Sequence, residues 1–208
     1  SGYSVYPDDI QFSSDGDVHL QWEWSQAPAS AGRHEGSYIR YRPSTGKFKT
    51  ITGQEVAVPV TQDTPNVVFQ PLTSGETYGQ NGSPPPLFQS AKLALYEDSA
   101  GSVHVQSAYR FQNETDGTWQ VRRARSISGG NSWSREIVFA VVDTSAAVGF
   151  THYAGVARIY YCRIGGSVWV LEKDGDAAWT NNELVPAKGK KVQRLQAIVR
   201  SDGVDTLY

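Results

Sequence analysis

The 208-residue chain has a single cysteine, almost no net charge and no long apolar run. Cys162 has no second cysteine to pair with, which excludes an internal disulfide, and its strand-like surroundings predict a small buried side chain. The 19 Lys and Arg residues nearly balance the 21 Asp and Glu residues, so charge gives no reason to expect a nucleic-acid or anionic-membrane partner. The longest apolar stretch, residues 137–142, is far too short to span a bilayer, so no membrane partner is expected either.

Helical periodicity is nearly absent, and a hairpin-like phrase recurs in its place. Residues 10–22 return as residues 93–106, and looser copies occupy residues 148–163 and 195–207. Each copy is an apolar run, a turn with Asp or Gly, and a second run rich in β-forming residues. A hairpin that recurs every few dozen residues is typical of propellers and related β arrays. The sequence therefore predicts an all-β fold, a β-propeller of four-stranded antiparallel blades.

The repeats divide the chain into blades of one propeller domain, residues 1–208. The expected blades are residues 6–52, 92–142, 148–185 and, in part, 194–208. The fourth repeat stops in mid-strand, whereas a propeller closes its ring with about four to eight complete blades. We therefore expect about three and a half blades of a larger ring of about seven. The remaining propeller segment of the same protein is the expected partner that completes it.

One short segment resembles a named repeat motif. Residues 126–133, Ser-Ile-Ser-Gly-Gly-Asn-Ser-Trp, are similar to the Asp-box or BNR repeat, Ser-x-Asp-x-Gly-x-Thr-Trp, with Ser128 in place of the Asp and Ser132 in place of the Thr. In that motif the polar residues close the hairpin between the third and fourth strands of a blade, and the Trp packs between blades. The resemblance implies a structural role for these residues, at the expected position in the second blade.

The wider pattern extends the resemblance to a family. It includes Gly101-x-Val-His-Val, then Tyr109-Arg110, then Ala124-Arg125-Ser126 before the box. This pattern resembles the BNR-containing propeller families that include ulvan lyases and related enzymes acting on uronic acids. The resemblance implies a secreted, extracellular or periplasmic polysaccharide lyase that cleaves an anionic, ulvan-like polysaccharide by β-elimination. No secretory signal is visible and the chain does not begin with Met, so we expect a processed or trimmed product.

Propeller geometry sorts the candidate site residues between two rims. The loops between second and third strands share one rim with the blade-to-blade connections, and the Asp-box hairpin lies on the opposite rim. Ligand sites in such enzymes usually occupy the first rim, where the pattern predicts His34 and Tyr109. His19, His104 and His152 are expected at the far rim, and we interpret them as structural.

Other polar residues belong to the rim predicted for ligand binding. Tyr6, Asp8 and Arg194 begin inner strands on that side, and Arg110 and Arg163 end second strands there.

β-Elimination from a uronate needs a base for the C5 proton, an acid for the leaving oxygen and a cation for the carboxylate. Tyr109 and His34 are the predicted acid–base pair. The resemblance implies Arg125 as the residue that binds the substrate carboxylate, and Arg123, next along the same strand face, is the second candidate. A strict blade assignment instead puts Arg125 towards the Asp-box rim, so the two arguments disagree. The alternative is that these arginines are solvated strand charges.

Two other functions stay open. A propeller glycoside hydrolase, sialidase-like or acting on rhamnosyl-glucuronate linkages, would need carboxylates or an arginine triad, and Asp8 and Asp9 are the rim acids in a suitable place. A non-catalytic carbohydrate-binding propeller would need only aromatic and polar rims.

The predicted chemistry requires no cofactor. No Cys/His cluster has the spacing of a structural zinc site, and Asp174-Gly175-Asp176 could hold calcium but is more often an ordinary turn. A structural calcium or zinc ion therefore stays open.

Overall fold

The computed structural model describes residues 3–26, 33–61, 64–65, 67, 88–112, 118–126, 133–141, 147–190, 192 and 194–208. Every regular element in this part of the chain is a β-strand, which confirms the predicted all-β fold. Among the described residues there is accordingly no helix of a length and hydropathy that could cross a membrane.

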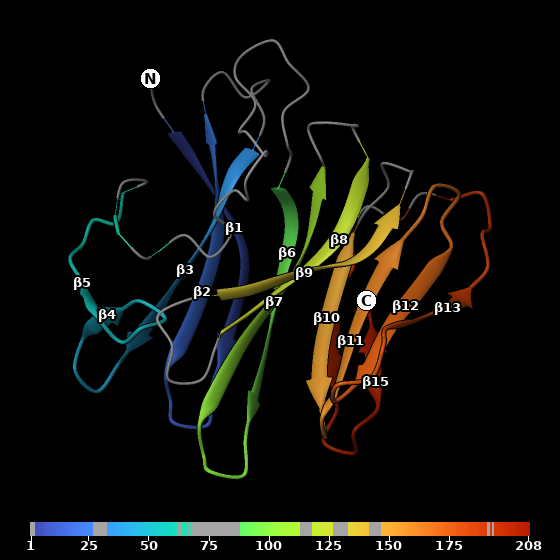
Figure 1. Ribbon diagram of the computed structural model, residues 1–208. Helices are drawn as coiled ribbons and strands as arrows, with labels where there is room; N and C mark the ends of the chain where they lie inside the picture. Colours follow the sequence, from blue (N-terminus) through green and yellow to red (C-terminus); the bar gives the residue numbers. More distant parts are fainter. Residues whose placement is uncertain are drawn as a thin grey trace.

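The strands form four antiparallel sheets, in which neighbouring strands follow one another along the chain (Figure 1). The first sheet contains β1 (Tyr3–Phe12), β2 (Val18–Gln26), β3 (Arg33–Arg42), β4 (Lys47–Lys49) and β5 (Glu55–Val56). The second contains β6 (Phe88–Glu97), β7 (Val103–Gln112), β8 (Trp119–Ser126) and β9 (Trp133–Val141). The third contains β10 (Val148–Tyr153), β11 (Val156–Cys162), β12 (Val168–Asp174) and β13 (Thr180–Val185). The fourth contains β14 (Ala197–Val199) and β15 (Asp205–Leu207).

The second and third sheets have the predicted four-stranded antiparallel form, and the first gains the short strand β5. The first strands of the four sheets lie next to one another, since β1 contacts β6, β6 contacts β10 and β10 contacts β14. In Figure 1 the first three sheets follow one another from left to right in chain order, and the fourth overlaps the third in this view. Each sheet thus has its first strand at the centre and its other strands further out, which is a propeller-like arrangement. The described residues form no closed ring.

This arrangement of sheets has two opposite edges. The hairpin rim carries the turns that join β1 to β2, β6 to β7, β10 to β11 and β14 to β15, and it lies at the bottom of Figure 1. The connection rim is the opposite edge, where β1, β6, β10 and β14 begin.

Apolar side chains fill the spaces between successive sheets. Because side chains alternate along a strand, each sheet presents one face to the preceding sheet and one to the next. Tyr38 of the first sheet packs with Leu93 and Phe111 of the second. Val121 of the second sheet belongs to one cluster with Ile159 of the third. Cys162, as predicted, is fully buried, in the cluster between the third and fourth sheets, and burial raises the pKa of its thiol to about 11.

The segment that resembles the Asp-box lies between the third and fourth strands of the second sheet. Ser126 ends β8, Trp133 begins β9, and these two residues pair with each other. The six residues between them lie outside the described part of the chain. The Trp133 ring meets the ring of Tyr38 edge to face at 5.5 Å, so it packs between the first and second sheets.

Candidate active site

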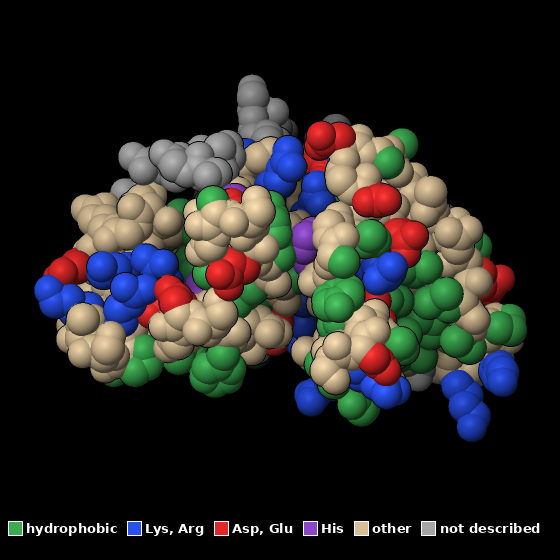
Figure 2. Space-filling view, turned by 90° about the horizontal axis from the view of Figure 1, so that it is seen from below, with side chains coloured by type: hydrophobic (Ala, Val, Ile, Leu, Met, Phe, Trp, Pro, Cys, Tyr) green, Lys and Arg blue, Asp and Glu red, His purple; other side chains and the backbone are tan. Residues whose placement is uncertain are grey.

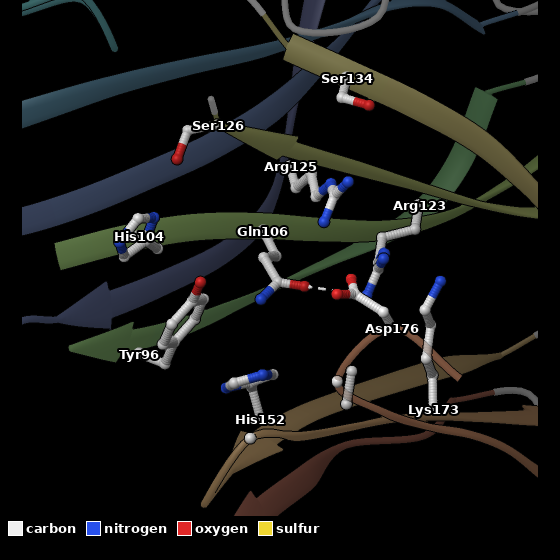
Figure 3. A pocket seen from close by; sticks show the side chains of 13 residues that line it. Tyr96, His104, Gln106, Arg123, Arg125, Ser126, Ser134, His152, Lys173 and Asp176 are labelled. Carbon is white, nitrogen blue, oxygen red and sulfur yellow. Dashed lines mark hydrogen bonds between the residues drawn. The ribbon is translucent and has the colours of Figure 1, made fainter. Parts of the chain in front are cut away.

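A cleft of about 530 Å³ separates the second sheet from the third on the side of the hairpin rim. Figure 2 views the molecule from that rim and shows a furrow with histidine and Lys or Arg side chains along it. The second sheet contributes Tyr96, His104, Gln106, Arg123, Arg125, Ser126 and Ser134. The third contributes His152, Gly155, Ala157, Lys173, Gly175 and Asp176 (Figure 3).

Strand register explains why these residues share one face. Gln106 of β7 pairs with Arg125 of β8, and Arg125 pairs with Ser134 of β9. Paired residues in an antiparallel sheet point to the same side, and so do residues two apart on one strand. Arg123 therefore lies on the same face as Arg125, next to it along β8.

The third sheet builds the opposite wall by the same rule. His152 of β10 pairs with Ala157 of β11, and Ala157 pairs with Lys173 of β12. The turn between the first two strands is only two residues long, Ala154 and Gly155, both with positive φ. Such turns match the twist of the flanking strands, so His152 is fixed within two residues of the hairpin's tip.

A stack of three rings joins the two walls. The Tyr96 ring lies parallel to that of His104, with centroids 4.6 Å apart and an interplanar angle of 11°. The Tyr96 ring also contacts that of His152, at 4.2 Å and 36°. The phenol of the second sheet is thus held between one imidazole of its own sheet and one of the third.

His104 is oriented by an acid in the adjacent turn. Its Nε2 lies 2.7 Å from Oδ2 of Asp98. The other carboxylate oxygen of Asp98 accepts hydrogen bonds from the backbone N–H groups of Ala100 and Ser102, each at 2.9 Å. The bond from His104 is the main reason that the pKa of Asp98 lies below its ordinary value. A carboxylate that accepts the Nε2 proton fixes the imidazole's tautomer and leaves Nδ1 as an acceptor in the neutral ring.

His152 is neutral near pH 7. Burial, and to a smaller extent the nearby charges of Arg123 and His104, lower its pKa to about 4. Its buried Nδ1 has no hydrogen-bond partner within the described ranges. A neutral imidazole can accept a proton, as a general base must.

The two cleft arginines differ in how they are engaged. Arg123 is buried, its guanidinium lies 2.5 Å from Glu136, and it donates a 3.4 Å hydrogen bond to Oε1 of Gln106. It also lies over the Trp179 ring, 4.9 Å from the centroid. Arg125 is exposed and makes no hydrogen bond or ion pair with any residue that the structure describes. A guanidinium at the wall of a cleft without a carboxylate partner there is available to an anionic ligand.

Lys173 adds a third cation on the opposite wall. Its Nζ lies 3.9 Å from Glu136 and 5.9 Å from the Trp179 centroid. Glu136, next to the cleft, therefore lies beside both Arg123 and Lys173, and Asp176 is the acid that lines the wall. Three cations against two acids favour an anionic ligand.

The structure brings together only part of the predicted site. Arg123 and Arg125 lie side by side in the cleft, and Arg125 is close to the Asp-box end of β8, as the strict blade assignment expected. Tyr109 is fully buried between the first and second sheets, on the face of β7 opposite to Gln106. The backbone of His34 belongs to β3, and its side chain lies outside the described residues. The roles of Tyr109 and His34 therefore stay predictions.

Sequence reasoning interpreted His104 and His152 as structural and did not single out Tyr96. The structure puts all three at the wall of the cleft. A signal was present, because His104 lies three residues after the turn glycine Gly101 and His152 three before Gly155. Equal distances from successive hairpin turns put side chains at the same height of neighbouring sheets. His19, in contrast, is buried against the Tyr38 hydroxyl at 2.7 Å and has the structural role that was predicted.

No group of three His, Cys, Asp or Glu side chains within the described ranges could hold a metal ion.

Comparisons with known proteins give a family and two solved structures of low similarity. The model of a family described as "BNR repeat-containing family member" matches residues 1–138. A comparison with curated proteins found no match. Two solved structures share 12% identity with this chain, with a TM-score of 0.49, over 90% of this chain and 52% of theirs. Both are described as a new family of polysaccharide lyase, PL25 ulvan lyase, one of them bound to -[GlcA(1-4)Rha3S]-. The chain thus spans about half the length of the solved structures that it matches.

Proposed function

The chain belongs to the BNR repeat-containing family, and from that premise we propose that its protein is a polysaccharide lyase acting on a uronic-acid-containing, ulvan-like polysaccharide. The observation that carries the proposal is the exposed guanidinium of Arg125 in a cleft that also holds a neutral imidazole, His152. A cation for the uronate carboxylate and a base for the adjacent carbon are the two groups that β-elimination needs together.

Arg125 is the proposed carboxylate-binding residue, and Arg123 supports it from the adjacent position. A planar guanidinium can donate two parallel hydrogen bonds to a carboxylate. Neutralising the carboxylate lowers the cost of the negative charge that develops when the C5 proton leaves. Because Arg123 already has Glu136 as its partner, its contribution is to the field of the cleft more than to direct binding.

His152 is the proposed base and the Tyr96 hydroxyl the proposed acid. The base takes the proton from C5, the electron pair of that bond forms the C4–C5 double bond, and the C4–O bond breaks. The departing oxygen receives the proton of the acid. His104 and Asp98 hold the Tyr96 ring in place, since His104 is stacked on that ring and bonded to Asp98.

Tyr109 and His34 are the alternative acid–base pair. That assignment would require the Tyr109 hydroxyl, which is buried between the first two sheets, to reach the substrate. A Tyr109→Phe variant separates the alternatives, because Phe keeps the packing of the ring and removes only the hydroxyl.

The proposal extends to the whole protein. A ring of about seven blades would be completed by further propeller segments of the same protein. We expect the enzyme to act outside the cell or in the periplasm, where polymeric substrates are available, and to need no metal for the chemical step.

The test is the ultraviolet absorbance of the unsaturated uronate that a lyase creates and a hydrolase does not. The full-length protein is incubated with ulvan and with other uronic-acid polymers, and absorbance is followed with time. A rising absorbance supports the proposal. Shortened chains with saturated ends would instead identify a hydrolase, and binding without cleavage a carbohydrate-binding propeller.

A matched pair of arginine variants links the activity to the cleft. Arg125→Ala is expected to lower kcat/KM by about 100-fold or more, as expected for loss of a group that stabilises developing charge. Arg200→Ala is the control, because Arg200 is an exposed arginine paired with Asp202 of its own turn. Equal activity of both variants would remove Arg125 from the mechanism.

A further inference from the structure

A group of cations lies on two neighbouring strands of the first sheet, close to the hairpin rim. Its members are Arg40 and Arg42 of β3, and Lys47 and Lys49 of β4. We call them the basic patch. Figure 2 shows Lys and Arg side chains grouped over the first sheet, at the left of the face that also holds the furrow of the cleft. The basic patch shares no residue with that cleft.

Strand register places like charges of the basic patch directly opposite each other. Arg40 pairs with Lys49, and Arg42 pairs with Lys47. Opposite residues of an antiparallel pair have Cα atoms about 4.5–5.5 Å apart, and like charges at such positions destabilise a sheet. In the other described pairings, Lys or Arg side chains that face a charged residue face an acid. These pairs are Lys49–Glu55, Arg123–Glu136 and Arg158–Glu172. The basic patch therefore contains a repulsion that the sheet does not need in order to fold.

A buried acid at the hairpin rim holds the two arginines of the basic patch in place. Asp17, which precedes β2, is fully buried. Its carboxylate accepts hydrogen bonds of 2.6 and 2.8 Å from Arg42 and lies 3.2 Å from Nε of Arg40. Arg42 also donates a hydrogen bond to Asp15 in the turn between β1 and β2. One carboxylate thus fixes both guanidinium groups at the end of the sheet that forms the hairpin rim.

Arg40 and Lys49 keep hydrogen-bonding groups that no described residue uses. The side chain of Arg40 donates no hydrogen bond to the described part of the chain and has only its ion pair with Asp17. The Nζ of Lys49 has no hydrogen bond or ion pair within the described ranges. Lys47, in contrast, pairs with Glu55 at 2.5 Å, but both side chains are more than half exposed, and such pairs contribute little. Two unused cationic groups that face each other can hold one anionic group between them.

We infer that the basic patch is a docking surface for a stretch of anionic polysaccharide outside the cleft. The identity of the polymer rests on the proposed function, whereas the charge of the ligand rests on the basic patch alone. A chain bound in the cleft must cross the second sheet to reach the basic patch. Because packed sheets lie about 10 Å apart, that path is on the order of 20 Å. A polymer is long enough to cover both sites, whereas a tetrasaccharide centred on Arg125 is not.

Other polyanions fit the basic patch less well. Domains that bind nucleic acid usually carry an excess of positive charge, whereas this chain has a formal net charge of −2. Binding to a membrane surface combines cations with exposed apolar side chains on the same face. The aromatic residues of these strands, Tyr41 and Phe48, pair with each other on the opposite face of the sheet. A cationic face without such apolar anchors suits a hydrated acidic polysaccharide.

Affinity electrophoresis of the full-length protein, in gels that contain dextran sulfate or neutral dextran, tests the inference. The two polymers share a backbone and differ in charge, and neither contains a uronate that a lyase could cleave. We expect dextran sulfate to retard the wild-type protein and neutral dextran not to. The double variant Lys47→Gln/Lys49→Gln should bind dextran sulfate about tenfold more weakly, because it removes two charged donors. Thermal unfolding checks that this variant keeps its fold.

Lys188→Gln/Lys190→Gln is the matched control. These two exposed lysines have the same spacing, and Gly189 between them bonds to Gly165 in the turn between β11 and β12, at the connection rim. The control should bind dextran sulfate as the wild type does. The inference is overturned if dextran sulfate does not retard the wild type, or if it retards the patch variant as strongly. Equal losses in the two double variants would also overturn it, because total charge would then explain the binding.

Vesicles of phosphatidylcholine and phosphatidylserine test the membrane alternative. If the wild type bound these vesicles and not dextran sulfate, and the patch variant lost the vesicles, the basic patch would be a membrane-binding surface and the inference would be wrong.

A second readout separates the inference from the proposed lyase activity. On ulvan, the patch variant should have a KM about tenfold higher and an unchanged kcat. On a tetrasaccharide from the same polymer, both constants should stay as in the wild type. Equal losses on the polymer and the tetrasaccharide would contradict the docking role. If the protein cleaves no uronic-acid polymer, the proposed function fails, and the electrophoresis still decides the inference.

Discussion

The space between the second and third sheets is open, whereas the corresponding space between the third and fourth is filled by a carboxylate. Asp205 of β15 accepts hydrogen bonds from Tyr160, Arg158 and Thr151 of the third sheet. Ala157 is the matching residue one repeat earlier, since each lies two residues after its turn glycine, Gly203 or Gly155. At this position one repeat thus carries a carboxylate that bonds the facing sheet, and the other carries an alanine at the wall of the cleft.

The partners on the facing strand also correspond. Gln106 lies five residues after Gly101, and Tyr160 lies five residues after Gly155. Tyr160 reaches across to Asp205, whereas Gln106 turns to Arg123 within its own sheet. Where the repeat carries Ala in place of Asp, Arg125 of the preceding sheet stays without a carboxylate partner among the described residues.

The largest expected effect comes from closing the cleft with the residue of the next repeat. Ala157→Asp should place a carboxylate among the cations of the cleft, compete with the substrate carboxylate and lower kcat/KM by about 100-fold or more. Activity is followed by absorbance of the unsaturated uronate, and thermal unfolding checks the fold. Ala157→Ser, which adds one neutral hydroxyl, is the control and should keep most of the activity. Full turnover by Ala157→Asp would contradict the comparison.

The converse change should act on stability. Asp205→Ala leaves the Tyr160 hydroxyl and the Arg158 guanidinium without this partner, and the expected loss is about 3 kcal/mol in the free energy of unfolding. Urea unfolding of the full-length protein measures it. Asp202→Ala, at an exposed acid of the same hairpin, should change stability by less than about 0.5 kcal/mol. Similar values for the two variants would show that Asp205 does not hold the interface together.

A smaller effect concerns pH. With a pKa of about 4, His152 is a base over the whole neutral range, and activity should be lost only as pH falls through about 4. A histidine with the ordinary pKa of 6.5 would instead make kcat/KM fall as pH decreases through about 6.5. Between pH 6.5 and pH 4 the imidazole of His152 is protonated in the unfolded state and neutral in the folded state. The free energy of unfolding is therefore unaffected by this group above pH 6.5 and falls as pH decreases towards 4. A kcat/KM profile with a limb near 6.5 would contradict the assigned role.

The sequence predicts the fold of this chain better than it predicts the candidate site. The repeated phrase predicts hairpins because turn chemistry and β-rich runs are local properties, and the strands confirm it. Alternation puts Arg123 and Arg125 on one face, and it puts Tyr109 on the opposite face of its strand from Gln106. Which face meets an open cleft is a tertiary property, so the sequence pointed to Tyr109, a core residue, and interpreted His152 as structural.

The smallest effect is expected at Lys173. Its Nζ lies 3.9 Å from Glu136 and 5.9 Å from the centroid of the Trp179 ring, so Lys173→Gln should raise KM by about twofold and leave kcat unchanged. Initial rates at several salt concentrations measure this, because added salt should shrink the difference between the variant and wild type. A fall in kcat of the Lys173→Gln variant would contradict this prediction, because it would mean that Lys173 contacts the reacting atoms.

The most direct measurement is the position of a bound substrate carboxylate. A crystal structure of the full-length His152→Ala variant with an uncleaved uronic-acid oligosaccharide would locate it. We expect the carboxylate at hydrogen-bond distance, about 2.7–2.9 Å, from the guanidinium of Arg125, with the sugar between the second and third sheets. A uronate bound at the connection rim, beside Arg194 or near Tyr109 and away from Arg125, would contradict it.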